Sequence, residues 1–182
     1  MHNFENRNTR AILSYANFVS TLPYYLQQLE MESLGKPASS ISEFKKTGQV
    51  ILPGHGQNAQ HSYLQLFHQG THKLCADIIT SRSEQEYIDD DRMGIKPISL
   101  LEAQAVTQSK LFSYGATNLK DIEEIKGDTP SNLFWFGGSL ESLGYLIATW
   151  EHRVFISSVM LQINPFDQFG VNAGKIYTNK YL

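Results

Sequence analysis

Apolar residues along the chain follow two alternating spacings, one typical of buried strands and one typical of amphipathic helices. Compact apolar runs predict strands at residues 9–15, 49–52, 73–80 and 131–136. Helical spacing with start and stop signals predicts helices between Thr21 and Gly35 and at residues 59–69, 100–112 and 171–181. Residues 139–163 are predicted to form one long helix or a bent pair. This alternation favours an α/β fold with a parallel sheet and helices on its faces. Because a strand follows the polar N-terminal tail at once, we expect the sheet to be incomplete.

The first predicted helix has clear boundaries. Thr21 is its expected cap, Pro23 lies in its first turn and Gly35 ends it. One face carries the apolar positions, which are Leu22, Tyr25, Leu26 and Leu29.

Glu32 lies just before the end of this helix. A carboxylate at that place meets the negative end of the helix dipole, which does not favour the helix. We interpret it as a candidate base for proton transfer, with a solvated surface charge as the alternative. Gln28 lies one turn earlier on the same face, so an amide and a carboxylate are side by side, an arrangement that suits a sugar hydroxyl.

Composition indicates one folded domain of 182 residues, with 41% hydrophobic and 18% charged residues. Fifteen Lys and Arg are balanced by 18 Asp and Glu, for a net charge of -3, so the basic stripe expected of a nucleic-acid-binding protein is missing. Binding of one small anion remains compatible with this charge.

Two features concern the cellular compartment. The single cysteine, Cys75, cannot form an internal disulfide, and the N-terminus does not resemble a secretion signal, so we expect a cytoplasmic protein. The most apolar stretch, residues 143–160, is interrupted by Glu151, His152 and Arg153. We therefore expect a buried helix there and no membrane association.

Two polar stretches are predicted to connect elements on the surface. Residues 84–91 carry five carboxylates and are interpreted as a solvated loop. Residues 118–129 are interpreted as a second surface connection.

Histidines are concentrated around the second predicted helix. Asn58 is its expected cap, which places His61 in the first turn, where the helix dipole favours a neutral imidazole that can exchange protons; a ring that only bonds nearby backbone is the alternative. His68 and His72 have the i, i+4 spacing of a zinc pair, with Cys75 close in sequence. Gly70 between them is expected to end the helix, and Cys75 falls in a predicted strand, which argues against a metal site.

The C-terminal segment brings an amide and a cation close in sequence. Gln168 and Lys175 are seven residues apart, about two turns if the segment is one helix, so both can face one anion. The alternative is a terminal helix with an exposed lysine. Asp167 is interpreted as a helix cap.

Six motifs, in this order, resemble the C-terminal third of the glucose-6-phosphate isomerase family. They are Gln-Gln-Leu-Glu-Met-Glu-Ser-Leu-Gly-Lys at 27–36, Asn-Ala-Gln-His at 58–61, His-Gln-Gly-Thr at 68–71, Gly-Asp-Thr-Pro-Ser-Asn at 127–132, Glu-His-Arg-Val-Phe at 151–155 and Asn-Pro-Phe-Asp-Gln-Phe-Gly-Val at 164–171. The resemblance covers nearly the whole chain. It implies a layered α/β/α fold of the sugar-isomerase (SIS) type, in which residues 1–182 form part of one such domain and a C-terminal helical segment.

The resemblance also implies an activity and roles for residues. The reaction is the cofactor-free, aldose-ketose isomerisation of glucose 6-phosphate to fructose 6-phosphate, a step of glycolysis and gluconeogenesis. Glu32 is implied as the base that moves a proton between C1 and C2 through an enediol, with Gln28 binding substrate. His61 is implied to open the sugar ring from the neighbouring subunit of a homodimer. Gln168 is implied to contact the phosphate, and Lys175 to assist ring opening and phosphate binding.

The chain departs from the family pattern at Leu34, Gln57 and Asn172, so the family's local hydrogen bonds are not implied there, but no proton-transfer group is removed. The family's phosphate-binding Ser/Thr loop and its catalytic arginine belong to the N-terminal two thirds, and nothing in this chain resembles them. We therefore expect little activity from the chain without the missing N-terminal portion. Two alternatives remain: an inactive isomerase-like module for binding or oligomerisation, and a zinc protein using the histidines.

Overall fold

A computed structural model of the chain describes residues 2–81, 99–117, 120 and 123–182. Its centre is a sheet of four parallel strands in the order β2-β1-β3-β4. The strands are β1 (Thr9–Ser14), β2 (Val50–His55), β3 (Leu74–Ser81) and β4 (Ser131–Phe136). The predicted parallel α/β fold is therefore confirmed.

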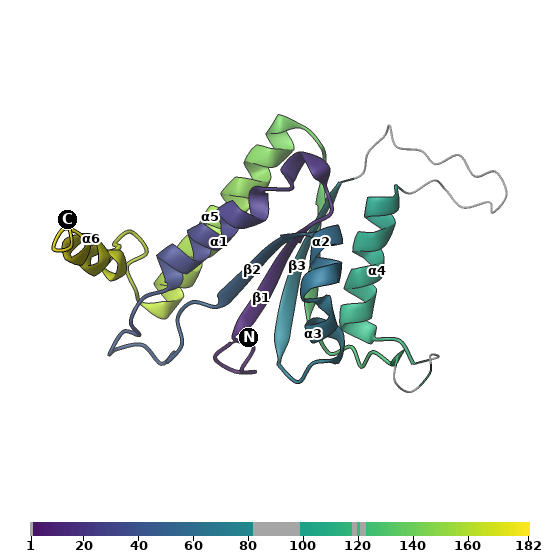
Figure 1. Cartoon of the computed structure of the whole chain (residues 1–182), viewed down its shortest axis with the longest axis horizontal. Coiled ribbons are helices and arrows are strands. Elements are labelled where there is room, and N and C mark those ends of the chain that lie inside the picture. Colours follow the sequence, from purple (N-terminus) through teal and green to yellow (C-terminus); the bar gives the residue numbers. More distant parts are fainter. Residues whose placement is uncertain (1, 82–98, 118–119, 121–122) are drawn as a thin grey trace.

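Helices cover both faces of the sheet (Figure 1). One face carries α1 (Leu22–Leu34) and α5 (Leu140–Leu161), and the other carries α2 (Gly56–Ser62), α3 (Leu64–Gln69) and α4 (Leu100–Tyr114). The pleat of β1 separates the two cores: Ile12 packs with α1 and α5, whereas Ala11 and Leu13 pack with α2, α3 and α4. The short elements are η1 (Asn17–Val19), η3 (Phe169–Val171) and α6 (Asn172–Thr178).

Strand β2 is longer than the sequence predicts. The predicted end at residue 52 is wrong, because β2 runs through Pro53 and Gly54 to His55. Among the described strands β2 forms one edge of the sheet and pairs only with β1, and proline, which has no N–H to donate, is tolerated on an edge strand.

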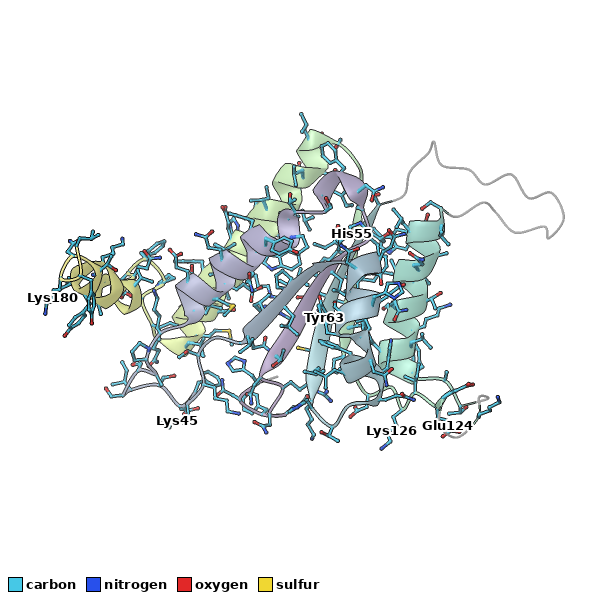
Figure 2. The ribbon with its side chains drawn as sticks, viewed as in Figure 1. Lys45, His55, Tyr63, Glu124, Lys126 and Lys180 are labelled. Carbon is cyan, nitrogen blue, oxygen red and sulfur yellow. The ribbon has the colours of Figure 1, made fainter. Side chains whose placement is uncertain are left out.

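The predicted helix at residues 59–69 is also wrong in detail, because it is two helices. α2 begins at Gly56, directly after β2, and the chain breaks at Tyr63, whose φ of -139° and ψ of 0° are not helical. Gly56 is required there because a Cβ would lie 2.3 Å from the Cζ atom of the buried Tyr15. Figure 2 labels His55 at the end of β2 and Tyr63 at the break.

Helix α5 is one continuous helix of 22 residues that starts at a capping box formed by Ser139 and Ser142. The prediction of a buried helix here is wrong, because only one side of α5 is buried. Leu146, Trp150, Val154 and Leu161 face the core, but Phe155, Ile156, Val159 and Met160 on its other side are more than half exposed. None of the helices in the described part of the chain is long and apolar enough to span a membrane. The predicted loop at residues 84–91 and part of the connection at 118–129 lie outside the described residues.

Candidate active site

Glu32 lies in the last turn of α1, as predicted. The helix starts after Thr21, whose side chain makes no capping hydrogen bond, has Pro23 in its first turn and ends at Gly35. A Cβ on Gly35 would lie 2.3 Å from the Met31 carbonyl oxygen, which explains the glycine. Glu32 is exposed, whereas Glu30, two residues earlier and about 200° around the helix, is buried. One turn of helix therefore carries one carboxylate into the core and another to the surface.

Gln28 and Glu32 share a face, as expected. The Gln28 Nε2 atom donates a hydrogen bond of 3.3 Å to Glu32 Oε2. Both side chains are exposed, so the second carboxylate oxygen of Glu32 remains accessible to a ligand.

Glu32 stands on the border between two pockets. The first, of about 530 Å³, lies between α1 and α5 and includes Leu29, Glu32, His152 and Phe166 in its wall. The second, of about 540 Å³, lies between the end of α1 and residues 167–171 and includes Gln168. The structure therefore brings Gln28, Glu32 and Gln168 to one region, although they come from distant parts of the sequence.

Lys175 does not join this group. Gln168 precedes η3, whereas Lys175 lies exposed in α6, so the two residues are not on one helix as the two-turn spacing assumed. Asp167 is also not a helix cap. Its Oδ1 atom lies 3.2 Å from Lys36 Nζ, so its partner is at the end of α1.

His61 lies far from Glu32 in the architecture. It is in the last turn of α2, so the argument that placed it at the positive start of a helix is wrong. α2 follows the carboxyl end of β2 on one face of the sheet, whereas Glu32 lies on the other face at the far end of α1, toward the amino ends of the strands (Figure 1). Within one chain these two residues therefore belong to helices on opposite faces of the sheet.

The histidine and cysteine cluster does not form a metal site among the described residues, where no group of three metal-ligating side chains is found. Gly70 ends α3 and Cys75 lies in β3, as predicted. His68 Nε2 is 2.8 Å from Gln108 Oε1, and burial lowers the pKa of His68 against the opposing effect of this hydrogen bond.

Sequence reasoning missed a buried ionic cluster on the core side of α1. Arg10 of β1 pairs with Glu30 of α1, and its Nε atom lies 3.5 Å from Asp77 Oδ2 of β3. Trp150 Nε1 donates to Glu30 Oε1 at 2.8 Å, and Arg153 Nη1 lies 2.9 Å from Asp77 Oδ2. Burial raises the pKa of Asp77, and the charge of Arg10 opposes that shift. The cluster thus connects α1 and α5, the two walls of the first pocket, to the sheet.

A signal for this cluster was present in the sequence. Glu30 continues the Leu22 and Leu26 series at i+4 spacing, which puts a carboxylate on the apolar stripe of α1. Asp77 interrupts an apolar strand in the same way. A charge at a core position indicates a buried partner.

Comparison with known proteins identifies the family. The model of the family described as phosphoglucose isomerase matches residues 1–182. The chain belongs to this family. A glucose-6-phosphate isomerase of Shewanella amazonensis is 36% identical over 196 residues, covering 99% of this chain and 36% of that protein. One from Acinetobacter venetianus is 36% identical over 197 residues, covering 100% and 35%.

Solved structures agree with this family. A glucose-6-phosphate isomerase from Chlamydia trachomatis superimposes with a TM-score of 0.83 at 31% identity, covering 99% of this chain and 35% of that one. A hypothetical protein from Thermus thermophilus has a TM-score of 0.77 at 21% identity, which shows the shared fold. The chain spans about a third of the length of the curated relatives it matches. The family resemblance of the six motifs is confirmed.

Proposed function

We propose that this chain supplies the base-bearing part of a glucose-6-phosphate isomerase active site, with Glu32 as the base. The observation that carries this proposal is the placement of Glu32: exposed, hydrogen-bonded to Gln28, and bordering the pocket that also contains Gln168. Family membership supports the same reaction.

The proposed reaction is a proton transfer between neighbouring carbons. Glu32 removes the C2 proton of the open-chain aldose, and the C2–H electrons form the C1–C2 double bond as O1 takes up a proton to give the enediol. The O2 hydroxyl then loses its proton to become the C2 carbonyl, and Glu32 returns its proton to C1 to give the ketose. The Gln28 amide fixes the orientation of one carboxylate oxygen, which leaves the other to accept the proton. Gln168 holds the phosphate end of the substrate.

We further propose that His61 opens the sugar ring in the active site of a second copy. His61 and Glu32 lie on opposite faces of the sheet, so a two-fold dimer can bring the His61 of each copy to the Glu32 of the other. This arrangement makes the dimer a requirement for activity.

The relatives are about three times as long as this chain, and electrostatic stabilisation of the enediolate is a major part of catalysis. We propose that the stabilising groups lie in the part of the enzyme that this chain does not cover. The completed enzyme for the tests is a mixture of this chain and the part of the Shewanella amazonensis isomerase that this chain does not match.

The proposed test combines two variants in the completed enzyme. Glu32→Gln alone and His61→Gln alone should each lose isomerase activity. An equal mixture of the two should regain about a quarter of wild-type turnover, because half of the dimers pair the two variants and each of those has one intact site. A mixture that regains nothing, although both variants dimerise, would contradict the shared site.

A second candidate function rests on the exposed apolar side of α5, which carries Phe155, Ile156, Val159 and Met160. An apolar surface of this kind suits an isomerase-like module that binds a partner without catalysis. Complete absence of isomerase activity in the completed enzyme, together with stable association of its two parts, would favour this candidate.

A further inference from the structure

The segment that carries Gln168 leaves the body of the protein after α5. Figure 1 shows α6 standing apart from the sheet and from the helices on both of its faces. Residues 171–182 are exposed throughout. Gln168 lies between the end of α5 and the exposed residues 171–182, so contacts of residues 162–170 with the rest of the protein determine its position.

Two contacts attach residues 163–167 to α1 and to the loop that follows it. Ile163 packs against the small cluster that contains Leu34. Lys36 then contacts Asp167 twice: its Nζ atom donates to the Asp167 backbone oxygen and lies 3.2 Å from the carboxylate Oδ1. The second contact is adjacent to Gln168 in sequence, so it sets where that side chain begins.

Lys36 is itself held firmly. Its side chain is only 9% exposed and that of Asp167 27%, so both charges are largely removed from water. The Lys36 backbone N–H donates to Leu34 O at 2.8 Å, and its backbone oxygen accepts from Thr47 Oγ1 at 2.6 Å. A lysine fixed in this way, four residues after Glu32, links the base to the segment across the pocket.

We propose that the Lys36–Asp167 ion pair is a latch that positions Gln168 opposite Glu32; its role in catalysis rests on the proposed function above. Lys36 and Asp167 are positioning residues and need not touch the substrate. The pair has a second effect, because Lys36 neutralises a carboxylate next to the proposed phosphate contact. An unpaired Asp167 would repel a phosphate dianion.

The latch is tested on the 182-residue chain by hydrogen exchange of residues 164–171. This region includes the Phe166 amide, which donates to Asn164 Oδ1 at 3.0 Å. Lys36→Met should speed exchange there by roughly tenfold, and Lys36→Arg should restore it to within about threefold of wild type, because it returns the charge. The matched control is Lys45→Met in the same loop (Figure 2), where Nζ contacts only the Ser42 carbonyl oxygen among the described partners.

Exchange that is equally fast in Lys36→Met and in wild type, or equally increased by Lys45→Met, would overturn the latch. In the completed enzyme, Lys36→Met should raise KM for fructose 6-phosphate by roughly tenfold and change kcat by less than about twofold, because the proton-transfer groups are intact. A fall in kcat with unchanged KM would overturn the positioning role. If the completed enzyme is inactive with the wild-type chain although its two parts associate stably, the proposed function fails, and the exchange experiment still decides the latch.

Discussion

Replacing Glu30 by glutamine should destabilise the chain strongly, although the same change at Glu32 should not. Glu30 is 5% exposed and its carboxylate pairs with Arg10, which is 6% exposed. Removing one partner of a buried ion pair costs about 3–5 kcal/mol, because the remaining charge stays buried without compensation. Glutamine keeps an acceptor for Trp150 Nε1, and Asp77 stays near Arg10, so we expect about 2–4 kcal/mol.

The assay is urea unfolding of the 182-residue chain, followed by the fluorescence of its tryptophans, of which Trp150 is fully buried. Glu32→Gln is the matched control, because it makes the same chemical change on the same helix at an exposed position. Glu30→Gln should lower the midpoint without changing the slope of the transition.

A loss of less than about 1 kcal/mol for Glu30→Gln would refute the reasoning, because that is the scale of an exposed ion pair. Equal losses for Glu30→Gln and Glu32→Gln would refute it too, since the two carboxylates would then have the same structural role. A large loss of unfolding free energy for Glu30→Gln and a small one for Glu32→Gln would show that the stability of the chain depends on Glu30. Glu32 would then be free of a structural role and available for catalysis.

Two further predictions concern pH and packing. Burial lowers the pKa of His68 in the folded chain below its ordinary value of 6.5. Between the folded-state pKa and pH 6.5, the unfolded chain therefore binds more protons than the folded chain. The free energy of unfolding consequently rises as the pH is raised toward about 6.5. His68→Gln should flatten the dependence of the urea midpoint between about pH 5 and pH 7, and an unchanged dependence would contradict the assignment. Gly56→Ala should cost about 1–3 kcal/mol in urea unfolding because its Cβ would meet Tyr15, whereas Gly144→Ala, with open space around its Cβ, should not destabilise α5; equal effects would contradict the packing argument.

Local signals in the sequence were sufficient to place Glu32. Pro23 and Gly35 mark the two ends of α1 through backbone geometry that each residue imposes by itself, and Gln28 follows from the helical repeat. The alternation of strands and helices similarly predicts the parallel sheet.

His61 could not be placed in the same way. Asn58 is a good helix cap by itself, but β2 continues through Pro53 to the position where α2 begins, because an edge strand tolerates proline. Where the strand ends is decided by pairing with β1, which the local pattern does not contain.

Asp167 shows the same limit over a longer distance. Its polarity and position before a helical segment fit a cap, but its partner is Lys36, 131 residues earlier in the chain. The buried cluster of Arg10, Glu30 and Asp77 likewise depends on elements that meet only after folding. Charged residues at apolar positions indicate in the sequence that buried partners exist, but not which residues they are.

The most direct test of Glu32 as the base is exchange of the substrate proton with solvent. The completed enzyme is incubated with fructose 6-phosphate in D2O, and deuterium incorporation at C1 is followed by NMR for the wild-type chain and for Glu32→Gln. We predict incorporation with the wild-type chain and a rate roughly 100- to 10,000-fold lower with Glu32→Gln, the range for loss of a general base. Incorporation at the wild-type rate by a folded Glu32→Gln chain would contradict the account.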